Sequence, residues 1–225
     1  MTPPKFPLPI VYPITSGATT PQTTPDDPQF SAILKLVRSA VEAEVPLFQI
    51  REKSMHERVL YDLTRRAAEI TRGSKTRLLV NGRVDIARAA GADGAHLTIP
   101  GLLKLLEEPN CPEFIVGLSI HSYLEAQVAD ALGPHFIVFG PVFETESKRV
   151  YGPPQGLEKL REVTGEVPEI PILAIGGITL DNVKDCFKAR ASGVAAIRLL
   201  NNAEKMPEIV AEIRRQFADH RGTLH

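Results

Sequence analysis

The feature that most constrains the fold is a regular alternation of short apolar runs with longer amphipathic stretches. Each apolar run has the length of a buried strand, and each stretch that follows has the spacing of a helix with one apolar face. Strands this apolar, each followed by a helix, indicate a parallel sheet covered by helices. The runs lie near 8–15, 46–52, 77–81, 94–98, 114–120, 136–142, 171–177 and 193–200.

Eight strand–helix units in 225 residues predict a single-domain α/β protein, a (β/α)₈ TIM barrel. We expect the barrel to span 1–225, with flexible tails at 1–7 and 221–225. An open doubly wound sheet is the rival, and it is disfavoured because no glycine fingerprint follows the first strand. A Thr/Pro/Asp-rich loop over 15–29 stands there instead, either as a lid or as a solvated loop.

Charge and composition narrow the class of partner. The 26 basic and 27 acidic residues nearly cancel and are scattered, so the sequence predicts a small-molecule partner and neither nucleic acid nor a membrane surface. No apolar run approaches the roughly 20 residues of a membrane span, and the first residues lack the pattern of a signal peptide, so we expect a cytoplasmic protein. Cys111 and Cys186 stand alone in the sequence and are expected to be buried thiols.

Polar side chains at the ends of the second and third strands are the first candidates for a site. The active site of such a barrel lies at the carboxyl ends of the strands. Strand alternation in QIREK places Gln49, Arg51 and Lys53 on one side, and Asn81 follows the third strand. An Arg and a Lys beside a Gln suit an anionic group such as phosphate, although a solvated strand end remains an alternative. Lys53 as a Schiff-base lysine is a weaker alternative, since nothing nearby is arranged to lower its pKa.

The later loops add hydroxyls, cations and paired glycines to the predicted phosphate site. Paired glycines allow backbone N–H groups to approach an oxyanion closely. In barrel enzymes the loops after strands seven and eight commonly bind phosphate. The candidates from these loops are Thr145, Ser147, Lys148, Gly176, Gly177 and Arg198.

His121 is the candidate for proton transfer. It sits at the junction of the fifth strand and its helix, near Ser119, and histidine titrates near neutral pH. A purely structural role at the helix start is the alternative. His96, inside the fourth apolar run, is expected to form a hydrogen bond within the barrel wall.

Six segments, in order and spacing, resemble the thiamine phosphate synthase superfamily of (β/α)₈ barrels. The synthases of this superfamily couple a pyrimidine pyrophosphate to a thiazole phosphate, and their pattern carries two magnesium-binding aspartates. The positions that match these aspartates hold Gly82 and Gly101 in this chain. Glycine offers no oxygen ligand to magnesium, so the resemblance predicts no metal site here. The segments are QIREK from 49, NGRVDIA from 81, GADGAHL from 91, GLSIHS from 117, FGPVFETESK from 139 and AIGGI from 174.

The residues of these segments resemble the TenI-type thiazole tautomerase branch more closely than the synthase branch. The resemblance implies a metal-free proton shift on a thiazole carboxylate phosphate, with no cofactor, and His121 as the acid–base group. One alternative is a thiamine phosphate synthase that binds magnesium through substitutes such as Asp85 or Glu144. A second alternative is a non-catalytic protein that binds thiazole phosphate. Arg198 departs from the small residue usual in both branches, and a homo-oligomer is compatible with the sequence.

Overall fold

In the computed structural model, the described part of the chain comprises residues 5–108, 114–145 and 153–222. Eight parallel strands form one sheet in the order β1-β8-β7-β6-β5-β4-β3-β2. A bridge between Ile14 and Gln49 links the two edges, so the sheet curls into a nearly closed barrel. The strands are β1 (Ile10–Pro13), β2 (Leu47–Ile50), β3 (Arg77–Asn81), β4 (Gly94–Leu97), β5 (Ile115–Ile120), β6 (Phe136–Phe139), β7 (Ile172–Ile175) and β8 (Gly193–Ala196).

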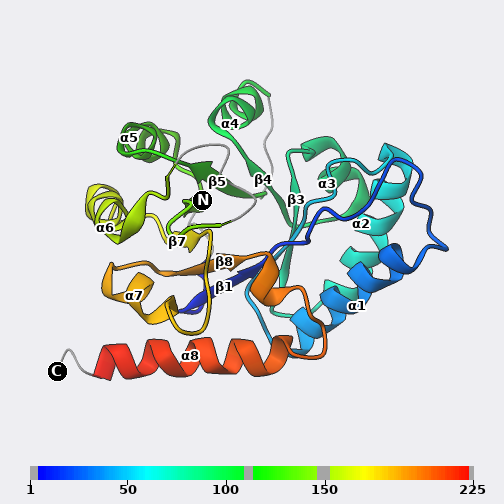
Figure 1. Cartoon of the computed structure of the whole chain (residues 1–225). Helices are drawn as coiled ribbons and strands as arrows, with labels where there is room; N and C mark the ends of the chain where they lie inside the picture. The colour runs from blue at the N-terminus through cyan, green and yellow to red at the C-terminus, as the bar shows by residue number, and fades with distance from the viewer. Residues whose placement is uncertain (1–4, 109–113, 146–152, 223–225) are drawn as a thin grey trace.

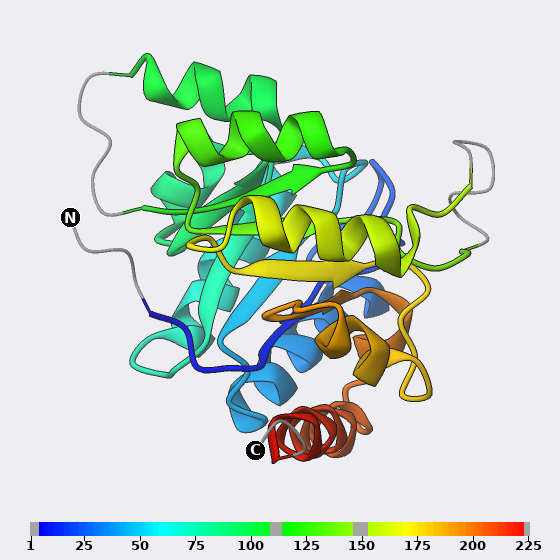
Figure 2. The ribbon, with the colours of Figure 1, turned by 90° about the vertical axis from the view of Figure 1, so that its left-hand side faces the viewer.

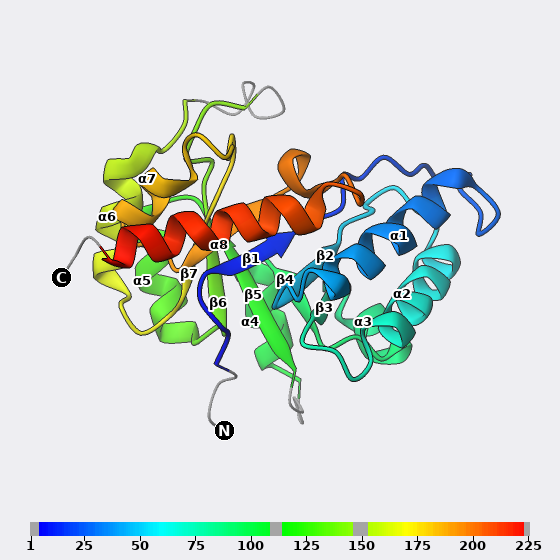
Figure 3. The ribbon, with the colours of Figure 1, turned by 90° about the horizontal axis from the view of Figure 1, so that it is seen from below.

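Helices alternate with the strands and lie around the outside of the barrel (Figure 1). The long helix α8 lies between α7 and α1 and closes the ring, as seen from below in Figure 3. Figure 2 shows the same helix nearly along its axis. The helices are α1 (Pro28–Glu42), α2 (Glu57–Thr71), α3 (Val84–Ala90), α4 (Ile99–Leu106), α5 (Tyr123–Leu132), α6 (Gly156–Glu166), α7 (Val183–Lys188) and α8 (Met206–Gly222), with the 3₁₀ helix η2 (Arg198–Leu200) after β8.

The prediction of a single-domain (β/α)₈ barrel is confirmed. At the C-terminus, α8 continues to Gly222, two residues into the stretch that we expected to be a tail. Residues 1–4 and 223–225 lie outside the described part of the chain, as does Cys111. Cys186 is buried, as expected, and burial raises the pKa of its thiol to about 12. No helix in the described ranges is long and apolar enough to span a membrane.

Two apolar layers account for the architecture. The outer layer packs the outward side chains of the strands against the helices, and the inner layer fills the barrel. Inside the barrel, the Tyr12 and Phe136 rings meet edge to face with centroids 5.2 Å apart, and the Phe6 ring packs edge to face with Phe136 at 6.1 Å. Because the interior is filled by these rings, the open end of the barrel above them is where a ligand can bind.

Gly117 on β5 is required by this packing. A Cβ atom there would lie 2.3 Å from the Phe136 ring and 2.6 Å from Nδ1 of His96. We expect Gly117→Ala to lower the free energy of unfolding by about 1–3 kcal/mol, the usual cost of overpacking a core. Urea unfolding measures this loss.

Gly165→Ala is the matched control, since a Cβ at this exposed position of α6 meets nothing within 4 Å. There the same substitution should stabilise the helix by about 0.5–1 kcal/mol. Equal stability of the two variants would show that the interior around Phe136 is loosely packed, contrary to this account.

Candidate active site

The carboxyl ends of β2 and β3 form the first part of the candidate site. Gln49 is buried and points into the barrel, where its Nε2 donates a hydrogen bond to Oδ1 of Asn81 over 3.1 Å. Strand β2 ends at Ile50, so Arg51 and Lys53 lie on the loop that follows. Their side chains are half-buried and exposed, respectively. In the described ranges, the Arg51 guanidinium forms no ion pair, which leaves its charge available to an anion.

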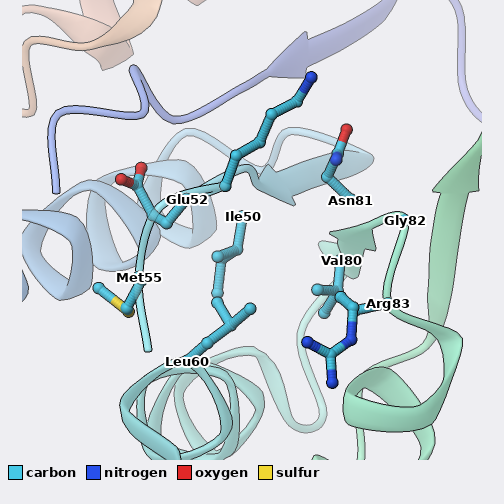
Figure 4. Close-up of a pocket in the computed structure, with 9 residues that line it drawn as sticks. Ile50, Glu52, Met55, Leu60, Val80, Asn81, Gly82 and Arg83 are labelled. Atoms are coloured by element: carbon cyan, nitrogen blue, oxygen red, sulfur yellow. The ribbon is translucent and has the colours of Figure 1, made fainter. Parts of the chain in front are cut away.

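A pocket of about 260 Å³ opens at this edge of the barrel (Figure 4). Its floor is apolar: Ile50, Val80 and Leu60 converge there from β2, β3 and α2. Asn81 and Arg83 point in opposite directions on its far side. The polar lining is completed by Glu52, Lys53 and the backbone at Gly82. The pocket therefore combines an apolar base with two cationic side chains.

Arg83 of this pocket is already neutralised by carboxylates. Its Nε and Nη2 donate to the two oxygens of Asp85 over 2.9 and 2.6 Å, and its Nη1 donates to Glu57 over 2.8 Å. The hydrogen bonds from Arg83 hold the pKa of the Asp85 carboxyl below its usual value. Among the described residues, Arg51 forms no such ion pair, so its guanidinium is the better candidate at this edge to bind an anion, with Lys53 beside it on the same loop.

Beneath the polar edge, a buried polar chain crosses the barrel interior. His96 on β4 lies with its Nε2 2.7 Å from Oγ of Ser119 and its Nδ1 3.4 Å from the Tyr12 hydroxyl. Burial, helped by the positive charge of Arg51, lowers the pKa of His96 to about 3. Burial likewise raises the pKa of Tyr12. His96 is thus a neutral, hydrogen-bonded residue of the barrel wall, which is the environment we expected for it.

His121 follows β5 and is exposed at the mouth of the barrel. Its Nδ1 lies 2.6 Å from the carbonyl oxygen of Gly140, and because a carbonyl only accepts, Nδ1 carries the proton. Nε2 is then the basic nitrogen of the ring. Ser119 hydrogen bonds to His96, so the structure places these two candidate catalytic side chains in different settings.

The loops after β6, β7 and β8 form the second part of the site. Gly176 and Gly177 have φ of +97° and +64°, which L side chains rarely adopt. A Cβ on Gly176 would lie 2.5 Å from the Pro141 Cβ, and one on Gly177 would lie 2.5 Å from the Glu144 carbonyl oxygen. These glycines let the β7 loop lie directly against the β6 loop, where Phe143 N–H donates to Gly176 O over 3.0 Å.

The remaining candidates sit at the same end of the barrel or outside the described residues. Arg198 begins η2 directly after β8 and is exposed, and Thr145 ends the described part of the β6 loop. Ser147 and Lys148 lie outside the described part of the chain. The sequence predicted one phosphate site that would combine Arg51 and Lys53 with Gly176 and Gly177. In the structure β1 and β8 lie between β2 and β7, so these residues form two groups on different sides of the barrel mouth.

The residues at the magnesium positions do not fit a metal. Gly82 and Gly101 supply no side-chain oxygen, and Gly101 lies within the first turn of α4. The substitutes that we considered do not replace them, because Asp85 is bound to Arg83, and Glu144 belongs to the β6 loop, with β4 and β5 between it and β3. Across residues 5–108, 114–145 and 153–222, no three His, Cys, Asp or Glu side chains gather as metal ligands would.

Glu52 is a site residue that alternation along β2 did not reveal. The pattern placed it on the side opposite to Arg51, yet its carboxylate is buried and accepts hydrogen bonds from the loop after β1. A buried carboxylate must find donors. The donors here come from a loop that is distant in the sequence. The sequence therefore offered a single indication of a special role for Glu52, its place between the basic residues Arg51 and Lys53.

Comparison with known proteins identifies the family. A family model described as thiamine monophosphate synthase matches residues 19–200. The thiamine-phosphate synthase of Moorella thermoacetica is 37% identical over 194 residues, covering 84% of this chain and 90% of that protein. The thiamine-phosphate synthase of Chlorobium limicola is 38% identical over 181 residues, covering 78% and 83%. A solved structure of the thiamine phosphate pyrophosphorylase from Pyrococcus furiosus superposes with a TM-score of 0.73 at 28% identity, covering 93% of this chain and 96% of that one.

These findings correct the expected branch. The prediction of a thiazole tautomerase was wrong, because the relatives are named as synthases and none of these names indicates a tautomerase. The relatives also support an enzyme over a non-catalytic binding protein. By the extent of the family match and the identity to its relatives, this chain belongs to the thiamine monophosphate synthase family.

Proposed function

We propose that this chain forms thiamine phosphate by joining a pyrimidine pyrophosphate to a thiazole phosphate. The observation that carries the proposal is that two groups of residues suited to binding anions lie at one barrel mouth. Arg51 and Lys53 follow β2, whereas the paired glycines and Arg198 follow β7 and β8. A reaction between two phosphorylated substrates needs two such groups.

In this proposal Arg51 and Lys53 bind the pyrophosphate. The bond to pyrophosphate breaks as the new bond to the thiazole forms, and negative charge gathers on the leaving oxygens. Cations fixed in advance stabilise such charge most effectively in a partly enclosed site.

The second substrate is assigned to the loops after β7 and β8. Backbone N–H groups of Gly176 and Gly177 are able to approach a phosphate closely, because no side chain stands on either residue. Arg198 adds a positive charge at the end of the neighbouring strand. Thr145 is the described residue of the β6 loop that we assign to the same phosphate.

Asn81, Ser119 and His121 are assigned to holding the organic parts of the substrates. Asn81 is oriented by Gln49, and Ser119 by His96, so both present fixed polar atoms near the mouth. His121 is fixed by Gly140 and offers Nε2 as an acceptor. No step is assigned to a metal, because Gly82 and Gly101 supply no side-chain oxygen and the described residues hold no group of three His, Cys, Asp or Glu side chains that could bind one.

Binding measurements test whether two anion sites exist. Inorganic pyrophosphate and thiazole phosphate are titrated into the protein by calorimetry, each alone and then in the presence of a saturating amount of the other. The proposal predicts that both bind together, with neither excluding the other. Mutually exclusive binding would mean a single anion site and would contradict a reaction between two phosphorylated substrates.

A further inference from the structure

The loop between β1 and α1 is fastened to the end of β2 by a buried carboxylate. Glu52 is 3% exposed, and its two oxygens accept three hydrogen bonds from this loop. Oε1 accepts from Gly17 N–H over 3.1 Å, while Oε2 accepts from Thr19 N–H over 3.1 Å and from the Thr19 hydroxyl over 2.6 Å. Figure 4 shows the Glu52 carboxylate turned away from Asn81 and Arg83.

The same loop also forms hydrogen bonds with the backbone of Gln49 and Arg51, the residues on either side of Ile50. Thr15 N–H donates to the Gln49 carbonyl over 3.0 Å, and Arg51 N–H donates to the Thr15 hydroxyl over 2.8 Å. Thr15 and Thr19 are both buried, so these bonds are shielded from water. Residues 15–19 are therefore fixed to the strand end that carries Arg51, which is the arrangement of a fixed wall rather than of a mobile lid.

Gly17 brings this wall against Arg51 itself. A Cβ atom on Gly17 would lie 3.3 Å from the Arg51 carbonyl oxygen and 3.6 Å from Nη1 of the guanidinium. The loop backbone thus stands beside the charged head of Arg51. A movement of Gly17 would therefore change the space beside that guanidinium.

We infer that Glu52 is a positioning residue: by fixing the loop at Gly17 and Thr19, its carboxylate holds Arg51 in place to bind the anionic substrate. The inference rests on the proposed role of Arg51 in pyrophosphate binding. Glu52 acts through the loop and does not itself contact the anion. A carboxylate suits this task because its oxygens accept several N–H and O–H donors at once, and such charge-assisted bonds are the strong ones.

The test is Glu52→Gln, which keeps the size of the side chain and replaces one accepting oxygen with a donating NH₂ group. One of the loop N–H groups then faces a donor, so the loop loosens. We expect the dissociation constant for inorganic pyrophosphate to rise about tenfold, the equivalent of one charge-assisted hydrogen bond. Amide hydrogen exchange at Gly17 and Thr19 should quicken, a change that calorimetry alone would miss.

Glu69→Gln is the control, because Glu69 is an exposed residue of α2 whose ion pair in the described part of the chain is with Arg65. Its pyrophosphate affinity and loop exchange should match the wild type. Thr19→Val is the second variant and removes only the hydroxyl donor to Glu52, so it tests the same clamp if Glu52→Gln does not fold. A smaller loss of affinity, about threefold, with faster exchange at Thr19 is expected from it.

The outcomes separate this inference from the proposed function. Unchanged affinity and unchanged exchange in both variants, while the wild type binds pyrophosphate, would overturn the role of Glu52 and leave the proposed function standing. A wild type that does not bind pyrophosphate at all would overturn the proposed function and, with it, the inference. Weaker binding together with faster loop exchange supports both.

Discussion

Replacing Arg51 with Ala is expected to weaken the binding of inorganic pyrophosphate by about 1.5–3 kcal/mol, the range for hydrogen bonds that involve a charged group. This corresponds to roughly a 10- to 150-fold rise in the dissociation constant. The reason is that the Arg51 guanidinium lies beside the loop at Gly17 and forms no ion pair within the described ranges. Calorimetric titration of both proteins measures the change directly.

Two companion measurements sharpen this prediction. Arg51→Lys keeps the charge but loses the planar fork of the guanidinium, so its affinity should fall between those of the wild type and Arg51→Ala. Arg215→Ala removes an exposed arginine of α8 that pairs with Glu212 and Asp219, and it should not alter pyrophosphate binding. Equal losses in Arg51→Ala for pyrophosphate and for the unphosphorylated thiazole alcohol would show that Arg51 maintains the structure and does not bind the anion.

Lowering the pH from 6.5 to 5 is expected to destabilise the protein through His96 by about 1.6 kcal/mol. The folded state keeps His96 neutral, with a pKa of about 3, whereas the unfolded chain takes up a proton near pH 6.5. Below pH 6.5 the unfolded state therefore binds more protons, and stability falls by about 1.4 kcal/mol per pH unit until the folded pKa is reached. Well above pH 6.5, His96 is neutral in both the folded and the unfolded state, so it no longer makes stability depend on pH.

The comparison of wild type with His96→Asn isolates this effect. Burial lowers the pKa of His135 as well, so that residue contributes a slope of the same sign, but it does so equally in both proteins. Urea unfolding at several pH values between 5 and 7 should show a shallower slope for His96→Asn. Parallel curves would mean that His96 is protonated in the folded barrel, against the account of a neutral wall residue between Tyr12 and Ser119.

The barrel could be predicted from the sequence because its cause is local. Each buried strand is a short apolar run, as in FIVF of β6, and each helix that follows repeats its apolar residues at helical spacing. The polar positions at the strand ends, such as Gln49 and Asn81, follow from the same register, since parallel strands bring their carboxyl ends to one side.

Contacts between distant segments could not be predicted in this way. Nothing in the residues around Glu52 tells that its partners are Gly17 and Thr19, because those hydrogen bonds depend on how the β1 loop folds back over β2. Alternation correctly separated Glu52 from Arg51, yet it could not show that the carboxylate fixes the wall beside that arginine. The division of the expected single phosphate site into two groups of residues likewise depends on the strand order around the barrel.

The choice of branch failed for a different physical reason. Gly82 and Gly101 showed that two carboxylates are absent, and this absence was interpreted as evidence for chemistry without a metal. The absence of these carboxylates shows that they do not bind a metal that neutralises the pyrophosphate. It does not show which reaction the protein catalyses. In the proposed reaction Arg51 and Lys53 carry part of that charge, so displacement of pyrophosphate by the thiazole is compatible with glycine at both positions.

The most direct test of the central claim is to supply the purified protein with the pyrimidine pyrophosphate and the thiazole phosphate together and to follow both products. The account predicts thiamine phosphate and pyrophosphate in equal amounts, at about 1 s⁻¹ or faster with both substrates saturating and Mg²⁺ present, as is typical of enzymes. If the Arg51→Ala variant is as stable as the wild type, it should form thiamine phosphate more slowly than the wild type at subsaturating pyrimidine pyrophosphate. Pyrophosphate release no faster than without protein, from a folded sample that binds both substrates, would contradict the claim that this chain joins them.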